Sequence, residues 1–158
     1  MFGLFKPKKQ ILVSPADGDI VKLEDVPDEV FSAKLVGEGI AIMPRSNTFV
    51  APVAGVVSKI FSTNHAFSIK TNNGLEVMVH IGLDTVELNG EGFKALAKEG
   101  DKVSVGKPII YADLAFIESK GKPIITPIVV NSEKEVTISS DKVKTIREGE
   151  ELMEITFK

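Results

Sequence analysis

The sequence predicts an all-β protein that folds as an antiparallel β-sandwich or flattened barrel with a few short helical turns. Segments rich in Val and Ile alternate with clusters of Gly, Pro, Asn and Asp, which is the pattern of strands separated by turns. These segments also repeat along the chain, and segments with a helical composition are short. With 158 residues, of which 43% are apolar, the chain can bury one core and has no room for a second domain of ordinary size.

The N-terminal segment, residues 1–10, is expected to be a flexible tail that precedes a single domain over residues 11–158. Its sequence, MFGLFKPKKQ, combines large apolar residues with three lysines. A segment of this kind can touch an anionic membrane surface, but Pro7 interrupts any helix and the segment is too short for firm binding. We therefore expect at most peripheral membrane contact.

The rest of the chain is expected to form strands with three short helical segments. Residues 93–100, FKALAKEG, have the composition of a helix, and single helical turns are expected within residues 24–31 and 114–120. The expected strands, in chain order, are residues 18–23, 39–44, 55–61, 66–70, 75–81, 108–114, 127–130 and 135–138.

Two pairs of segments repeat, which indicates a fold built from two interlocked copies of one small β-unit. VSPADGDIV, residues 13–21, is echoed by VAPVAGVVS, residues 50–58, with a Pro-x-x-Gly turn before a β-branched strand in each. Residues 98–113 have a fainter counterpart in residues 146–157. A single copy could not cover its own hydrophobic face, so the two copies are expected to pack against each other.

The composition excludes several classes of protein. The chain has no Cys, which excludes disulfides, thiolate nucleophiles and Cys-type zinc sites. The formal net charge is -3, with 19 Lys and Arg against 22 Asp and Glu, which argues against nucleic-acid binding. No apolar run is long enough for a membrane span or a signal peptide, so we expect a cytoplasmic protein, with a monomer as its simplest state.

Both histidines of the chain, His65 and His80, lie in residues 63–85, a segment that is expected to form a β-hairpin around the turn sequence TNNG. A loop with an even number of residues would place them on one face, within about 4.5 to 8 Å at Cβ. A three-residue loop would place them on opposite faces. An even loop would also divide the apolar residues of the hairpin between its faces, with Phe67, Ile69 and Met78 beside the histidines and Leu75, Val77, Val79 and Ile81 opposite.

Two interpretations of the histidine pair remain open at this point. On a core face the imidazoles are buried structural residues, and on an open face they form a reactive centre in an apolar docking surface. Zinc hydrolysis would need a third ligand such as Asp84, and a serine triad is not indicated because no G-x-S-x-G motif occurs. Phosphoryl transfer needs less, because one imidazole attacks the phosphoryl group while the other, and a hydroxyl such as that of Thr63, bind its oxygens.

TNHAFSI, residues 63–69, is followed by VHIGLDTVELNGEGF, residues 79–93, and these segments closely resemble the glucose-type enzyme IIA proteins of the bacterial phosphoenolpyruvate-dependent sugar phosphotransferase system. The likeness extends to EDVPDEVFSAKLVGEGIAIMP, residues 24–44, to VAPVAGVVSKIF, residues 50–61, and to TPIV, residues 126–129. It covers nearly the whole chain after the N-terminal tail. The resemblance implies the family's antiparallel β-sandwich, of the barrel-sandwich hybrid type.

The resemblance further implies a phosphocarrier in which His80 accepts a phosphoryl group on Nε2 from the phosphohistidine of the small carrier protein HPr. The group then passes to a cysteine on the IIB domain of a glucose-type sugar permease during sugar uptake. In this assignment His65 stabilises the phosphoryl group and supports its onward transfer, and Thr63 orients His65. A backbone carbonyl, that of Gly82, accepts a hydrogen bond from Nδ1 of His80.

A partner-binding surface is implied as well. Asp28 and Asp84 are expected to meet a basic residue of HPr near the histidines. An apolar ring around the site is expected from six residues: Val30, Phe31, Leu35, Val36, Phe61 and Met78. No cofactor is required, although zinc could bind between His65 and His80 if a partner supplied a carboxylate, and regulatory target proteins are further candidate partners.

Several alternatives stay open beside these assignments. Asp28 could serve only as a turn cap, and Asp84 could close an Asx-turn with Thr85. A biotinyl- or lipoyl-type carrier has hairpins that resemble APVAGVV and KEGDKVSVGKPII, but the lysine turn that such carriers modify is absent. A zinc-dependent hydrolase of lysostaphin-like architecture would use a His-x-His pair, which this chain lacks.

Overall fold

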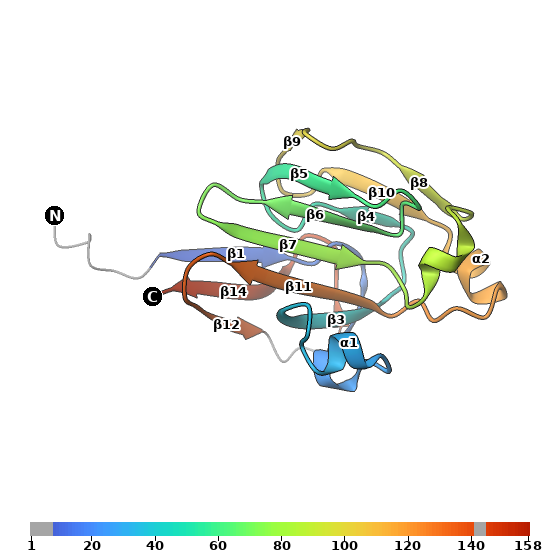
Figure 1. Ribbon diagram of the computed structural model, residues 1–158, viewed down its shortest axis with the longest axis horizontal. Helices are drawn as coiled ribbons and strands as arrows, with labels where there is room; N and C mark the ends of the chain where they lie inside the picture. Colours follow the sequence, from blue (N-terminus) through green and yellow to red (C-terminus); the bar gives the residue numbers. More distant parts are fainter. Residues whose placement is uncertain (1–7, 141–144) are drawn as a thin grey trace, which may run out of the picture.

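The computed structural model describes residues 8–140 and 145–158. Within these ranges the chain folds into strands that are joined by turns and short helical segments (Figure 1). The helical segments are η2 (Leu23–Asp25), α1 (Glu29–Ser32), η3 (Thr85–Leu88) and α2 (Leu114–Ser119). The strands are β1 (Lys9–Val13), β2 (Gly18–Lys22), β3 (Glu38–Pro44), β4 (Thr48–Val50), β5 (Gly55–Ile60), β6 (Ala66–Lys70), β7 (Leu75–His80), β8 (Phe93–Ala95), β9 (Lys102–Val103), β10 (Pro108–Ala112), β11 (Thr126–Ser132), β12 (Val136–Ser140), β13 (Thr145–Ile146) and β14 (Glu151–Phe157).

The strands form antiparallel sheets that share one main hydrophobic core. Among the described residues, the largest sheet has the order β13-β2-β3-β11-β7-β6-β5-β9, and two smaller sheets have the orders β1-β14-β12 and β4-β10-β8. In Figure 1, β11 and β7 lie side by side at the centre of the largest sheet. Core residues come from all three sheets, for example Val77 of β7, Leu152 of β14 and Ile110 of β10. The predicted all-β sandwich is therefore confirmed.

The two sequence repeats occupy equivalent places in the fold. Val13 N donates to the Pro52 carbonyl over 2.9 Å, and Val50 N donates to the Pro15 carbonyl over the same distance. The fainter repeat behaves in the same way: Ser14 N donates to the Glu150 carbonyl, and its counterpart Ala51 N donates to the Lys107 carbonyl, each over 2.8 Å. These reciprocal hydrogen bonds interlock the two copies, as the sequence predicted.

One predicted helix is wrong. Residues 93–100 contain the short strand β8, in which Phe93 pairs with Ala112 of β10. The Phe93 side chain packs into the main core, so tertiary pairing outweighs the helix propensity of the Ala, Leu and Lys residues that follow it. The predicted helical turns within residues 24–31 and 114–120 are confirmed by α1 and α2.

A second, smaller core covers part of the outer face of the largest sheet. Ala41 of β3, Val129 of β11 and Met78 of β7 point away from the main core, because side chains alternate along a strand. Residues 23–36, inserted between β2 and β3, pack on this outer face through Leu23, Val26 and Phe31. Figure 1 shows α1 of this insertion beside β3, and the Phe31 ring of α1 lies 5.0 Å, centroid to centroid, from that of His80 at the end of β7. The insertion therefore covers one end of β7 on the side that faces away from the main core.

The N-terminal boundary differs slightly from the prediction. β1 begins at Lys9, two residues before the predicted start of the folded region, and pairs with β14. Residues 1–7 of the predicted tail, with their predicted membrane contact, lie outside the described residues. Among the helices of the described ranges, none has the length and apolar character needed to cross a membrane.

Candidate functional site

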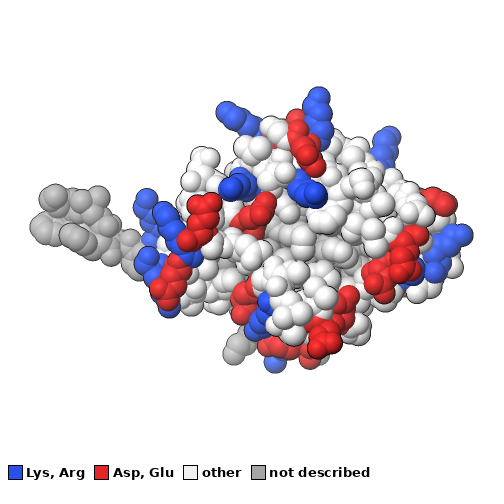
Figure 2. All heavy atoms as spheres, viewed as in Figure 1, with Lys and Arg blue, Asp and Glu red and all other residues white. Residues whose placement is uncertain are grey.

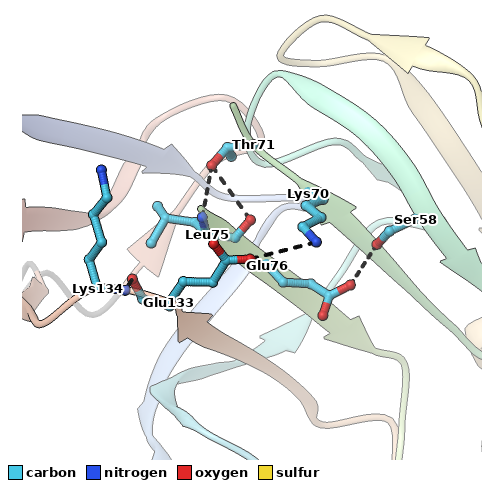
Figure 3. Close-up of polar contacts among 8 residues, drawn as sticks. Ser58, Lys70, Thr71, Leu75, Glu76, Glu133 and Lys134 are labelled. Atoms are coloured by element: carbon cyan, nitrogen blue, oxygen red, sulfur yellow. Dashed lines mark hydrogen bonds and ion pairs between the residues drawn. The ribbon is translucent and has the colours of Figure 1, made fainter. Parts of the chain in front are cut away.

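The β6–β7 hairpin has the odd loop that was expected to separate the histidines. Lys70 pairs with Glu76 and Ala66 pairs with His80, which leaves residues 72–74 as a three-residue loop. Thr71 N donates to the Leu75 carbonyl over 2.9 Å, and the hydroxyl of Thr71 accepts from Leu75 N (Figure 3). The prediction of an even loop is therefore wrong. The division of faces is wrong too, because the core face consists of Phe67, Ile69, Leu75, Val77, Val79 and Ile81, while Met78 packs in the second core.

The two imidazoles nevertheless meet, because His65 lies outside the regular strand. β6 begins at Ala66, and the residue before His65, Asn64, has a left-handed backbone with a φ of 58°. A turn closed by Asn64 N and the Phe61 carbonyl, 2.7 Å apart, precedes the strand. His65 therefore lies between this turn and the first residue of β6, so the alternation of side chains along the strand does not determine the direction of its ring. The ring centroids of His65 and His80 lie 4.9 Å apart, with an angle of 80° between the ring planes.

His80, the last residue of β7, is held in one tautomer. Its Nδ1 lies 2.7 Å from the carbonyl oxygen of Gly82, and a carbonyl can only accept, so Nδ1 carries the proton and Nε2 keeps a lone pair. The Phe31 ring lies 5.0 Å away, centroid to centroid. Burial lowers the pKa of His80, although the Gly82 carbonyl and the charges of Asp28 and Asp84 act in the opposite direction. The imidazole is therefore uncharged at neutral pH.

His65 is packed more deeply than His80. Its side chain is 3% exposed, and the Phe61 ring lies 5.2 Å away, centroid to centroid. Burial and the neighbouring His80 lower its pKa to about 4. The Thr63 hydroxyl lies 2.5 Å from Nδ1 of His65. A second uncharged imidazole, oriented by a hydroxyl, thus stands beside the ring of His80.

An apolar hollow of about 340 Å³ opens beside His80. It is lined by Asp28, Val30, Phe31, Val36, Phe61, Met78, His80, Asp84 and Val86. In Figure 2, uncharged surface lies above α1 on this face, with acidic side chains gathered at its lower edge and on its right side. The predicted Leu35 is not among the lining residues, and its side chain is 70% exposed. Val86, which was not predicted from the sequence, belongs to η3, a helical turn that Asp84 followed three residues later by Glu87 could have indicated.

Two acidic residues stand at the rim of this hollow. Asp28 caps α1, because its carboxylate accepts from Val30 N over 3.0 Å, and its charge also acts on His80. The capping role that was considered for Asp28 is thus present together with proximity to the histidine. Asp84 has a left-handed φ of 57° and makes no capping hydrogen bond to η3, so the Asx-turn considered for it is absent. Two negative charges therefore flank an apolar hollow that is lined by a neutral imidazole.

The arrangement suits nucleophilic attack better than metal catalysis. Among residues 8–140 and 145–158, no group of three or more His, Cys, Asp or Glu side chains is placed to hold a metal ion. His65 and His80 could supply two zinc ligands through their Nε2 atoms, since each Nδ1 is already in a hydrogen bond. A catalytic zinc normally takes three protein ligands. The two histidines thus could supply two of these three ligands, and a third, such as a carboxylate, would have to come from elsewhere.

Comparison with known proteins places this geometry in context. A protein-family model described as phosphoenolpyruvate-dependent sugar phosphotransferase system, EIIA 1, matches residues 10–136. The PTS system glucose-specific EIIA component of Haemophilus influenzae is 50% identical over 136 residues, which are 86% of this chain and 82% of that protein. The solved structure of glucose permease IIA from Mycoplasma capricolum matches with a TM-score of 0.89 at 37% identity, covering 93% of this chain and 96% of that one.

A longer relative contains the same kind of segment within a larger protein. The PTS system N-acetylglucosamine-specific EIICBA component of Klebsiella pneumoniae is 51% identical over 136 residues, or 84% of this chain. The match covers 21% of that protein, so this chain corresponds to about a fifth of its length. The family match favours phosphoryl transfer over the hydrolase and the biotinyl- or lipoyl-type carrier.

Proposed function

The chain belongs to the EIIA 1 family of the phosphoenolpyruvate-dependent sugar phosphotransferase system, and we propose that it carries the phosphoryl group of a glucose-type system on Nε2 of His80. The observation that carries this proposal is the hydrogen bond from His80 Nδ1 to the Gly82 carbonyl. It leaves the Nε2 lone pair available beside an apolar hollow. A neutral imidazole with a fixed tautomer is the form of histidine that can attack phosphorus.

The transfer is a displacement between two imidazoles. The Nε2 lone pair of His80 forms a bond to phosphorus while the bond from phosphorus to the donor's histidine nitrogen breaks, and the electron pair leaves with the donor imidazole. Nδ1 of His80 keeps its proton throughout and continues to donate to Gly82. The imidazolium-like charge that develops on His80 is stabilised by this carbonyl and by the carboxylates of Asp28 and Asp84.

His65 is proposed to hold the phosphoryl oxygens. The Thr63 hydroxyl is placed to donate to Nδ1 of His65, which leaves the proton of that ring on Nε2. With the ring 4.9 Å from that of His80, this N–H can donate to an oxygen of the bound phosphoryl group. As the family resemblance implies, His65 is expected to assist departure toward the next acceptor more than arrival.

The proposed partners follow from the surface around His80. The donor is HPr, which would place a basic residue against Asp28 and Asp84 and an apolar residue in the hollow. The acceptor is a cysteine of a IIB domain, and the longer relative, whose name describes an EIICBA component, supports a relay of this kind. The relay is proposed to run in the cytoplasm. Regulatory targets that present a carboxylate to His65 and His80 could complete a zinc site there.

The test is transfer of labelled phosphate from phosphoenolpyruvate through enzyme I and HPr. We expect the protein to take up an acid-labile, base-stable phosphate, and His80→Gln to take up none, a loss of more than about 1000-fold because no other group replaces the nucleophile. Matching circular dichroism spectra and melting temperatures would establish that the variant is folded. Label retained by His80→Gln would refute the acceptor, and a wild-type protein that takes no label but hydrolyses substrates with zinc would refute the function.

A further inference from the structure

The short loop between His80 and η3 is held by a buried hydroxyl that the phosphoryl relay leaves unassigned. Thr85, the first residue of η3, is fully buried, and its Oγ1 donates to the Ile81 carbonyl over 2.6 Å. Its methyl group packs directly under Gly82, since a Cβ placed on Gly82 would lie 2.6 Å from Thr85 Cγ2. Both ends of this side chain therefore touch the segment that carries the carbonyl bonded to His80.

The orientation of that carbonyl depends on two neighbouring peptide groups. The Gly82–Leu83 peptide contains the carbonyl that accepts from His80. The N–H of the same peptide, on Leu83, donates to the Pro123 carbonyl over 3.1 Å. The Ile81–Gly82 peptide is held through its carbonyl, that of Ile81, which accepts from the Thr85 hydroxyl. Together these two anchors set the left-handed backbone of Gly82, whose φ is 78°.

The preceding peptide needs its anchor because Gly82 offers little resistance to rotation. Glycine adopts positive and negative φ angles with similar ease, so a peptide next to it can turn unless other groups hold it. Ile81 N is already fixed by the His65 carbonyl over 2.8 Å, which ties the same residue to the second histidine. The Thr85 hydroxyl thus holds the carbonyl of the Ile81–Gly82 peptide, directly after a peptide that is tied to His65.

We propose that Thr85 is a positioning residue for phosphoryl transfer: its hydroxyl fixes the Ile81–Gly82 peptide, and thereby the carbonyl that keeps the Nε2 lone pair of His80 available. This inference rests on the proposed role of His80 as acceptor. It adds a residue that touches neither the phosphoryl group nor the partner.

The test compares Thr85→Val with two other variants. Val keeps the size and both branches of the side chain but cannot donate, so the Ile81 carbonyl loses its hydroxyl partner. Thr85→Ser keeps the hydroxyl and loses the methyl group. Thr71→Val is the matched control, since Thr71 is also buried and its hydroxyl also holds backbone groups of β7, at the opposite end of the strand (Figure 3). Six residues of strand separate the two ends by about 17 Å.

Two readouts are required. Long-range proton–nitrogen spectra of the ¹⁵N-labelled protein near neutral pH report which nitrogen of His80 is protonated. We expect the Nδ1–H form in the wild type, in Thr85→Ser and in Thr71→Val, and a mixture of both forms in Thr85→Val. The rate of phosphoryl uptake from phosphorylated HPr should fall about tenfold in Thr85→Val and stay within about twofold of the wild type in the other two variants.

Each outcome decides the proposal. A folded Thr85→Val with an unchanged His80 tautomer, or with an uptake rate within twofold of the wild type, would overturn it. If Thr85→Val does not fold, Thr85→Ser decides, because loss of the Nδ1–H form in a variant that keeps the hydroxyl would also overturn it. A wild-type protein with the expected tautomer that accepts no phosphoryl group would instead refute the proposed function, since the spectra need no partner protein.

Discussion

The two ends of β7 share one strand and differ in what covers them. At the turn end, the outward side chain of Glu76 lies among polar groups, with half-buried Ser58 bonded to it at 2.8 Å and the exposed ion pair of Lys70 with Glu133 nearby (Figure 3). At the other end, Met78 and His80 are covered by the insertion of residues 23–36. The strand therefore runs from a charged, solvated surface into an apolar site with two neutral imidazoles.

The difference shows how burial prepares a histidine for chemistry. The turn itself is closed by contacts within a few residues, such as those of Thr71 with Leu75. The histidine end depends on Phe31, Phe61 and the Pro123 carbonyl, which come from three other parts of the chain. Long-range packing removes water from the imidazoles and keeps them uncharged, which the turn end could not do for an ionisable group.

The largest effect is expected at the histidine end, in phosphoryl transfer, when His65 beside His80 is changed. His65→Gln keeps a hydrogen-bond donor but loses the imidazole geometry. We expect uptake from HPr to persist and onward transfer to a IIB domain to fall about 100-fold, the usual size of a lost transition-state donor. Rapid-quench measurement of each step separates them. Equal losses in both steps would contradict the division of roles between the two histidines.

The second difference concerns pH and stability. The pKa of His65 falls from 6.5 to about 4 on folding, so the unfolded chain binds the extra proton between these values. Stability should therefore decrease as the pH falls from about 7 to about 4, by as much as about 3 kcal/mol from this residue. Urea unfolding of the wild type and His65→Gln across this range isolates the contribution. An identical slope in both proteins would contradict the depressed pKa.

A smaller effect is expected from the charge at the rim of the hollow. Asp28→Asn removes the charge but can still cap α1, since Asn and Asp are similar N-caps. We expect about tenfold weaker binding of HPr at low salt, with less difference at high salt. The control is Glu133→Gln, an equal change of charge at the turn end, which should leave binding unchanged. Equal weakening by both variants would indicate a general charge effect.

The smallest effect is expected at the turn end itself. The Lys70–Glu133 pair has a separation of 3.8 Å, with side chains that are 56% and 72% exposed. Exposed ion pairs contribute little, so Lys70→Met should change the free energy of unfolding by less than about 0.5 kcal/mol and leave phosphoryl uptake unaltered. Denaturant titration measures the first quantity and the labelling assay the second. A loss of uptake would show that the two ends are coupled.

Most strands were predictable because Val- and Ile-rich segments stood between clear turn residues. The repeats were predictable for a similar reason, and the reciprocal hydrogen bonds of Val13 and Val50 confirm them. β8 was not, because Phe93 forms a strand by pairing with β10, a partner that lies distant in sequence. The loop of residues 72–74 was also mispredicted, since Asn and Gly fit several tight turns and the core face alone selects among registers.

The sequence by itself determined the all-β class, the doubled β-unit and the gathering of both histidines in one segment. Those features depend on composition and on neighbours along the chain. Only the tertiary structure decided that the two rings meet despite an odd loop, because β6 begins only at Ala66 and a turn with the left-handed Asn64 precedes His65. It also decided that Phe31 and Thr85 surround the segment after β7, since packing between distant residues, and not their order, sets the environment of an imidazole.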